Sequence, residues 1–530
     1  MRLTRYIFNP ALWFDESVLA VDIITRSFPQ LIQPSQIYNV SLPLGFAAIE
    51  KLIIQFLGYS EYAFRLFPLL TAVASLILFY VMAKKIMSPG AVLMGLALFV
   101  FSDQLVHFAT EFKPYASDGM FTILIYMAVL HVQSENFSSK SLFLLASIGI
   151  VAPWFSNPSV FVLAGAGSGI LLSLLAKRKW DKAKKVFIVG TIWLINFGLY
   201  FQLYLKKLTS NDIKGVWTND LGFFMPFPPS SLPDIKWFFE SFFGMFHKPL
   251  GLTLLGIGVF LFMLGIASML RNRKENLIIL TAPIVIAVLA SAFQKYVIYE
   301  RMLIFYAPFM IILISEGFSY LQEKTRGDLT IATVLTCLLF IHPMYMMVNR
   351  LANPPIRQNV KPLLQHIKQN WQQGDIIYIY YKSEYQFEYY AKHYPDAAYN
   401  FNEDQYFIGT APPSWDVLFR KSKVNDITLS TLINKTQEEQ QIHFKESVRS
   451  ELKLLTGYKR VWALYSLPGI NAFNSDKFYL DFFNALGKKT YSVRNVSDPE
   501  TQAGLQAKGG MAALYRYDIL KNGNHIETIQ

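Results

Sequence analysis

The sequence has a single cysteine and few charged residues. Cys337 lies within an apolar run, so the chain can form neither an intramolecular disulfide nor a cysteine-based metal site. Charged residues make up 16% of the 530 residues, whereas hydrophobic residues make up 53%. The mean hydropathy of +0.29 is too high for an ordinary soluble enzyme of this length. We therefore expect an integral membrane protein whose parts outside the membrane fold without disulfides.

The sequence also lacks the basic patches and glycine-rich loops of proteins that bind nucleic acids or nucleotides. The net charge is +12, but the basic residues concentrate in short loops between apolar runs, where they usually set the orientation in the membrane. Gly509-Gly510 stands alone before a strand-like stretch and is no phosphate loop. We expect membrane lipids, and no nucleic acid, among the partners.

Residues 1–61 contain no apolar run long enough to cross a bilayer. The stretch 42–57 is apolar but is interrupted by Pro43, Glu50 and Lys51, which predicts an interfacial or re-entrant helix. Ten transmembrane segments are predicted further along the chain. Their approximate bounds are 66–82, 89–107, 118–133, 141–156, 158–176, 186–205, 250–270, 277–294, 302–320 and 329–348.

The charges of the loops predict the topology. Most basic loop residues belong to one set of alternate loops, at 84–85, 140, 177–185, 271–274 and 324–326. The other short loops contain only Lys113, Lys295 and Arg301. Because positive loops stay in the cytoplasm, the second set is expected on the extracytoplasmic face of the inner (plasma) membrane, together with Asp15, loop 206–249 and everything after residue 349.

After residue 349 the apolar runs shorten, and Asn353-Pro354-Pro355 is typical of a linker. Strands are predicted at 375–381, 460–465, 490–493 and 512–517, with helices following at 382–392 and 476–486. The predicted fold is therefore mainly α, with a polytopic helical membrane domain followed by an outward-facing α/β domain. The expected divisions are 1–61 for a first outer loop with interfacial helices, 62–348 for the membrane domain and 349–530 for the extracytoplasmic domain.

An adjacent acidic pair, Asp15 and Glu16, follows two aromatic residues near the start of the chain. Two carboxylates close to a membrane are costly unless they face water, a metal or a cationic group. One interpretation is a solvated acidic pair in a loop. The other, which the position favours, is a general base that deprotonates an acceptor hydroxyl with or without a metal.

A second polar group lies in the short loop between two predicted spans. It contains Glu111, Lys113, Tyr115 and Asp118, a polar density that packing does not explain. Lys113 can provide a point charge for a phosphate, or it can extend to the membrane interface.

Two arginines have a similar ambiguity. Arg301 can bind a phosphate or carboxylate with its planar fork, or it can pair with Glu300. Arg65 can do the same, or it can pair with Glu61 at i,i+4 spacing.

The order and spacing of these motifs resemble the polytopic GT-C-type glycosyltransferases. Within that class they look most like the bacterial family 39-like group, the relatives of protein O-mannosyltransferases and of the lipid A aminoarabinose transferase. The resemblance covers roughly residues 10–350. It rests on Leu12-Trp-Phe-Asp15-Glu16, Gly58-Tyr-Ser-Glu61-Tyr-Ala-Phe-Arg65, Glu111-Phe-Lys113-Pro114-Tyr115-Ala-Ser-Asp118 and Glu300-Arg301 followed by Pro308.

The resemblance implies a membrane glycosyltransferase that uses a polyprenyl-phosphate-linked sugar and inverts the anomeric centre on the outer face. It implies catalytic roles for Asp15 and Glu16, with Asp15 as the base. Lys113, Arg301 and Arg65 would handle the donor phosphate, with Glu111, Tyr115 and Asp118 as further substrate-binding candidates. A divalent cation is possible at Glu16, Glu111 or Asp118, but no spacing establishes one.

Several alternatives stay open on the sequence alone. The sugar is a hexosyl or pentosyl group, and the acceptor is a protein, a glycan or a lipid. A transporter or flippase of lipid-linked sugars and a non-catalytic membrane scaffold are rival functions, and neither requires Asp15. A transmembrane helix normally precedes the acidic pair in the family. We therefore expect one upstream of this chain, left out because the start codon was misplaced.

Overall fold

The computed structural model describes residues 1–33, 35, 42–208, 223–325, 329–353, 357–409, 437–466, 481, 483–495 and 512–519. The chain folds into two compact units, each built from segments that are separated in the sequence. The first unit comprises Met1–Ile7, Ser41–Ile49 and Arg65–Ala352. The second comprises Phe8–Val40, Glu50–Phe64 and Asn353–Gln530.

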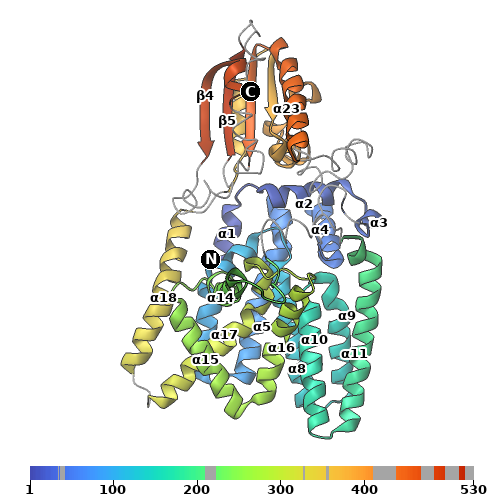
Figure 1. Cartoon of the computed structure of the whole chain (residues 1–530), viewed down its shortest axis with the longest axis vertical. Coiled ribbons are helices and arrows are strands. Elements are labelled where there is room, and N and C mark those ends of the chain that lie inside the picture. The colour runs from blue at the N-terminus through green and yellow to red at the C-terminus, as the bar shows by residue number, and fades with distance from the viewer. Residues whose placement is uncertain are drawn as a thin grey trace. The chain divides into compact units, whose positions relative to one another are not determined.

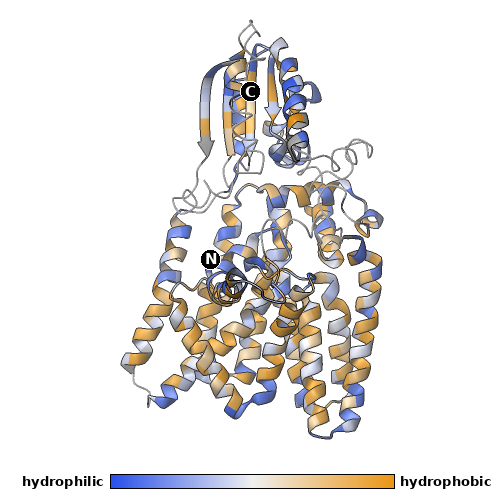
Figure 2. Cartoon of the chain, in the orientation of Figure 1, coloured by the Kyte–Doolittle hydropathy of each residue, from blue (hydrophilic) through white to orange (hydrophobic). Residues whose placement is uncertain are grey.

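Within the described residues, eight helices are long and apolar enough to cross a membrane. Hydrophobic residues cover most of the length of these helices, as the orange ribbons of Figure 2 show. The mainly helical, multi-pass membrane fold is therefore confirmed. The spans are Glu61–Ile86, Tyr115–Ser134, Ser159–Ala176, Trp180–Leu205, Leu255–Asn272, Lys274–Ala292, Glu300–Lys324 and Thr333–Ala352.

Two of the predicted segments differ from these spans. The segment at 89–107 is a pair of helices, Pro89–Phe101 and Asp103–Thr110, bent by 54°. Ser102 lies at the bend, and its hydroxyl accepts a hydrogen bond from the Leu105 N–H at 3.3 Å, which caps a new helix start. The segment at 141–156 is the apolar helix α9, Ser139–Phe155, of 17 residues.

The core of the first unit is formed around α17 (Ala307–Lys324), the most deeply buried helix of the bundle (Figure 1). It packs on α15 (Leu255–Asn272) and α6 (Pro89–Phe101), while α10 (Ser159–Ala176) packs on α16 (Lys274–Ala292). The α15–α17 contact depends on glycine. A Cβ atom at Gly265 would lie 1.9 Å from the Leu313 carbonyl oxygen, and one at Gly317 would lie 1.8 Å from the Leu261 carbonyl oxygen.

The other helices of the first unit complete the bundle, with α8 packed on α9 and α9 on α11. They are α1 (Arg2–Phe8), the greater part of α5 (Glu61–Ile86), α7 (Asp103–His107), α8 (Tyr115–Ser134), α11 (Trp180–Tyr200), α14 (Leu232–His247) and α18 (Leu329–Ala352).

The second unit contains a five-stranded sheet of order β2-β1-β3-β5-β4. The strands are β1 (Asp375–Ile379), β2 (Tyr406–Ile408), β3 (Arg460–Ser466), β4 (Gly487–Asn495) and β5 (Ala512–Ile519). β1 is parallel to β2 and β3, whereas β5 is antiparallel to β3 and β4. The predicted strands are thus present, and β2 is an addition too short to recognise from its sequence. Of the predicted helix at 476–486, residues 481 and 483–486 are described and are helical.

The helices of the second unit come from both ends of the chain. From the N-terminal part come α2 (Phe14–Thr25), α3 (Phe28–Leu31) and the end of α4 (Leu44–Leu57). From the C-terminal part come α19 (Lys361–Gln369), α20 (Glu384–Glu388) and α23 (Gln437–Leu454). α2 packs on α20, and the Phe14 ring meets the Tyr385 ring edge-on with centroids 6.5 Å apart. The helix that carries the acidic pair therefore belongs to the same unit as the sheet.

Candidate functional site

The acidic pair lies in the first turn of α2, directly after the N-cap residue Trp13. Asp15 is 8% exposed and Glu16 is 1% exposed, so both carboxylates are buried rather than solvated. The Glu16 carboxylate accepts a hydrogen bond from the Trp13 N–H at 3.4 Å. Negative charge is favourable at a helix N-terminus, where the backbone N–H groups have no partner in the helix. The two adjacent acids therefore have a defined setting, in which Glu16 caps the helix.

Side chains from the C-terminal part of the second unit bind the backbone just before Asp15. The Leu12 N–H donates to the Tyr390 hydroxyl at 2.7 Å, and the Gln386 amide donates to the Leu12 carbonyl at 2.9 Å. The Phe14 N–H donates to the Gln358 side-chain oxygen at 2.8 Å. Leu12, Gln358, Gln386 and Tyr390 are all buried. Residues far apart in the sequence thus position the acidic segment.

Tyr390 also reaches an ion pair whose carboxylate is buried. Its hydroxyl donates to the Glu61 carboxylate at 3.1 Å, and the Lys361 ammonium pairs with the same carboxylate. The ammonium lies 4.7 Å from the centre of the Tyr394 ring, a cation–π contact. Burial and the Glu61 charge raise the pKa of Tyr394. Glu61 therefore has a partner in α19, which sequence spacing does not reveal.

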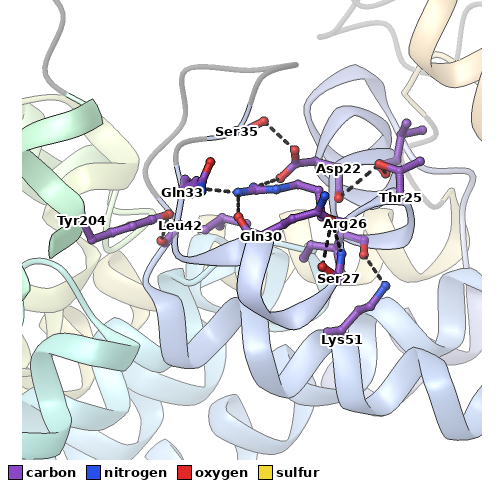
Figure 3. A network of polar contacts seen from close by, with 12 residues as sticks. Asp22, Thr25, Arg26, Ser27, Gln30, Gln33, Ser35, Leu42, Lys51 and Tyr204 are labelled. Carbon is purple, nitrogen blue, oxygen red and sulfur yellow. Dashed lines mark hydrogen bonds and ion pairs between the residues drawn. The ribbon is translucent and has the colours of Figure 1, made fainter.

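A polar network holds the C-terminal end of α2 (Figure 3). Arg26 donates to Asp22 at 2.8 Å and also binds the carbonyls of Gln30 and Gln33. The Ser35 hydroxyl donates to the other Asp22 oxygen at 2.6 Å. Lys51 donates to the carbonyls of Ile23 and Ile24 at 2.9 and 3.0 Å, where a cation is favourable at a helix C-terminus. The helix that carries Asp15 is therefore held at both of its ends.

The first unit contains the remaining predicted residues. Glu111, Lys113, Tyr115 and Asp118 are all buried, as is Arg65 in α5. The His107 Nε2 atom lies 3.0 Å from the Glu111 carboxylate. The Ser117 hydroxyl donates to the carbonyls of Pro114 and Phe155 at 2.6 and 3.0 Å, which holds the start of α8. The polar density of this loop is thus buried and internally organised.

Tyr296 is a residue of this group that the sequence did not single out. Burial raises the pKa of Tyr296, and the charge of Asp118 and then Tyr115 raises it further. Its hydroxyl donates to the Met302 carbonyl at 2.5 Å, next to Arg301. The sequence could have indicated Tyr296 only by its position, five residues before Arg301 in the loop predicted to face outward. Tyr296 therefore joins Tyr115, Asp118 and Arg301 as a candidate for substrate contact.

Arg301 is half-buried at the start of the 3₁₀ helix η4, Glu300–Tyr306. The neighbouring Glu300 lies 3.4 Å from the Lys248 ammonium. Phe223 stacks on Tyr299 with ring centroids 4.0 Å apart. These contacts hold the two residues that precede Arg301.

A small cavity of about 20 Å³ lies beside Tyr115 in the first unit. Arg2, Ser75, Phe99 and Ile304 also line it. The Arg2 guanidinium donates to the Phe99 carbonyl at 3.1 Å, and burial lowers the pKa of Arg2 to about 10. The volume suits about one water molecule and not a sugar. The cavity is therefore no substrate pocket in its own right.

The described part of the chain contains no group of three or more His, Cys, Asp or Glu residues that could hold a metal ion. Glu16 caps α2, and Glu111 lies beside His107. Divalent cations held by a protein usually have several such ligands. Among the described residues, Glu16, Glu111 and Asp118 belong to no such group, and no chemical step is derived through a metal.

Comparison of the sequence with family models and with curated proteins finds no match. Solved structures do match. ArnT from Cupriavidus metallidurans in the apo state is 11% identical, with a TM-score of 0.52, over 97% of this chain and 96% of that chain. ArnT bound to undecaprenyl phosphate is 10% identical, with a TM-score of 0.50 and the same coverage.

The archaeal oligosaccharyltransferase AglB from Archaeoglobus fulgidus, in complex with an inhibitory peptide and a dolichol-phosphate, is 11% identical with a TM-score of 0.44. The match covers 95% of this chain and 70% of the AglB chain. ArnT is an aminoarabinose transferase, and both neighbours are GT-C glycosyltransferases. The match to ArnT confirms the GT-C resemblance of the sequence at the level of the fold, along almost the whole chain.

Proposed function

From the GT-C fold that this chain shares with ArnT, we propose that it is a membrane glycosyltransferase. It transfers a sugar from a polyprenyl-phosphate donor to an acceptor on the outer face of the membrane, with inversion. The observation that carries the proposal is the match to ArnT over 97% of the chain, including a structure of ArnT bound to undecaprenyl phosphate. The buried acids and cations described above supply residue types that this chemistry needs.

Asp15 acts as the general base in this proposal. The acceptor hydroxyl oxygen attacks the anomeric carbon as the bond from that carbon to the phosphate oxygen breaks. Asp15 accepts the hydroxyl proton, and polyprenyl phosphate leaves with the bonding electrons. Attack on the face opposite the leaving group inverts the anomeric configuration. Glu16 supports Asp15 by capping the helix that carries it.

Lys113, Arg301 and Arg65 bind the donor phosphate in this proposal. The phosphate gains charge as the sugar leaves, and fixed cations in a site with little water stabilise such charge strongly. Lys113 and Arg65 are buried, which keeps their charges out of water. Glu111, Tyr115, Asp118 and Tyr296 contact the sugar hydroxyls, for which carboxylates and phenols are suitable partners.

The orientation follows from the loop charges. The basic loops remain in the cytoplasm, so the acidic pair and the C-terminal sheet face outward from the inner membrane. The acceptor is a hydroxyl-bearing glycan, lipid or protein of the cell envelope. The transferred group is a hexosyl or pentosyl sugar.

The test uses purified protein in liposomes with a panel of polyprenyl-phosphate sugars and mixed acceptors. Release of free polyprenyl phosphate is measured for the wild type, for Asp15→Asn and for Asp181→Asn, an exposed aspartate of α11. We expect Asp15→Asn to lower turnover by roughly 10²–10⁴-fold and Asp181→Asn to leave it unchanged. No release with any donor, together with intact binding of lipid-linked sugars, would instead support a flippase or a scaffold.

A further inference from the structure

The backbone of residues 12–14, just before Asp15, is held by hydrogen bonds to side chains. The N–H groups of Leu12, Trp13 and Phe14 donate to Tyr390, Glu16 and Gln358 respectively, and the Leu12 carbonyl accepts from Gln386. The Trp13 and Phe14 N–H groups are among those that a helix start leaves without partners inside the helix, and Leu12 lies just before the helix. Three of the four bonds come from residues more than 340 positions away in the sequence.

We propose that Tyr390, Gln386 and Gln358 are positioning residues that fix the orientation of Asp15 for the transfer. The inference rests on the proposed function, because it assigns these residues to the same reaction. It makes the C-terminal part of the chain a component of the catalytic apparatus rather than an appended domain.

Both the nitrogen and the oxygen of the Gln386 side-chain amide have hydrogen-bond partners. Its nitrogen donates to the carbonyls of Leu12 and Gln358 at 2.9 and 3.0 Å, and its oxygen accepts from the Ser466 hydroxyl. Ser466 is the last residue of β3, the central strand of the sheet. A fully bonded buried amide has one orientation, because rotation would leave polar atoms unpaired. The sheet therefore holds Leu12 through a single rigid side chain.

The Tyr390 hydroxyl is held equally firmly. It accepts from the Leu12 N–H and donates to Glu61, whose carboxylate pairs with Lys361. A hydrogen bond to a carboxylate is stronger than one between neutral groups. The charged acceptor also directs the hydroxyl proton away from Leu12, which leaves the oxygen lone pairs for the Leu12 N–H. The Glu61–Lys361 pair thus prepares Tyr390 to bind the backbone.

A structural role alone would not need this precision. One neutral hydrogen bond contributes only about 1 kcal/mol to folding. A base displaced by about 1 Å from its reacting proton, however, can slow a reaction by about 100-fold. Loss of one of these bonds should therefore change turnover much more than it changes stability or donor binding.

The experiment compares Tyr390→Phe, Gln386→Leu and the control Tyr399→Phe with the wild type, in the full chain. Tyr399 is also a buried tyrosine of the second unit, and its hydroxyl binds Gln365 rather than the acidic segment. We expect Tyr390→Phe and Gln386→Leu to lower kcat by about 10–100-fold while the donor KM changes by less than about 3-fold. Tyr399→Phe should retain wild-type kcat.

Hydrogen exchange of peptides covering residues 9–19 provides a readout besides activity. Exchange at the Leu12 amide should rise at least about 5-fold in Tyr390→Phe, by loss of one hydrogen bond, while the peptides of β1 and β3 keep their protection. An active wild type with an equally active Tyr390→Phe would overturn the positioning role. Unchanged exchange at Leu12 would overturn it too. A wild type without turnover for any donor would instead refute the proposed function itself, and the positioning role with it.

Discussion

Asp15 and Glu16 are neighbours in the sequence, but we propose different tasks for them at the start of α2. Glu16 accepts a hydrogen bond from the Trp13 N–H, whereas Asp15 accepts the proton in the proposed reaction. An amide oxygen can accept the same bond, so Glu16→Gln should retain activity within about 3-fold. Glu16→Ala removes the acceptor and should lower the free energy of unfolding by about 1 kcal/mol. Urea unfolding and donor turnover measure the two effects, and an inactive but stable Glu16→Gln would give Glu16 a chemical role.

Lys113 is the cation for which the choice between phosphate binding and a membrane anchor can be made most directly. It is buried, which does not suit a side chain that extends to the interface. Loss of a charge-assisted bond of about 2 kcal/mol should raise the donor KM about 30-fold in Lys113→Ala. The control is Lys140→Ala, at an exposed lysine. Equal KM values for the two variants would refute the phosphate role.

Glu50 gives a prediction about pH. It is fully buried in α4, neither carboxylate oxygen has a hydrogen-bond partner among the described residues, and burial raises its pKa well above 4.5. The folded protein therefore holds this proton more tightly than the unfolded chain does. The associated stability is fully present below pH 4.5 and is lost as the pH rises through the folded-state pKa.

Glu50→Gln cannot lose a proton, so it should show a flatter dependence of stability on pH. We expect its melting temperature to equal that of the wild type near pH 5 and to exceed it at pH 8. Thermal unfolding in detergent across this range measures the difference. Parallel curves for the two proteins would show that Glu50 stays ionised in the folded state.

At the scale of elements, hydrophobicity predicted the spans well because lipid imposes a minimum apolar length on every helix. It could not place their ends. α5 begins at Glu61, earlier than the predicted 66, and the Glu61 carboxylate is paired with Lys361, some 300 residues later in the sequence. The bend after Phe101 depends on the Ser102 hydroxyl capping a second helix, a local signal within an otherwise apolar run.

The contact between α15 and α17 can be tested with glycine substitutions. A Cβ atom at Gly317 would lie 1.8 Å from the Leu261 backbone, so the two helices must separate in Gly317→Ala. Gly256→Ala in α15 is the matched control, because no atom lies within 4 Å of its Cβ position. Overpacking of this kind typically lowers stability by about 1–3 kcal/mol, whereas Gly256→Ala should be neutral or slightly stabilising. Melting temperatures in detergent compare them, and a Gly317→Ala protein as stable as the control would show a looser contact.

At the scale of the whole molecule, the sequence singles out candidate residues for the chemistry, but it does not reveal which residues hold them in place. Asp15 stands out locally, since two acids follow two aromatic residues. The residues that bind the backbone next to Asp15 do not stand out in the sequence. Gln358, Gln386 and Tyr390 belong to no recognisable motif, and only the fold brings them to Leu12 and Phe14. Folding the N-terminal segment into the same unit as the sheet is a long-range event that no local pattern encodes.

The orientation of the chain can be tested with introduced cysteines, because only one natural cysteine has to be removed first. In a Cys337→Ser background, single cysteines at Gln373 and Lys179 provide two exposed reporters, one before β1 and one in the basic loop between α10 and α11. The positive-inside rule predicts that a membrane-impermeant maleimide labels Gln373→Cys in intact cells and Lys179→Cys only after permeabilisation. Gln373 belongs to the same compact unit as Asp15, so its label also reports the side on which the acidic pair lies. The reverse pattern would place Asp15 in the cytoplasm, where an acceptor of the outer face could not reach it.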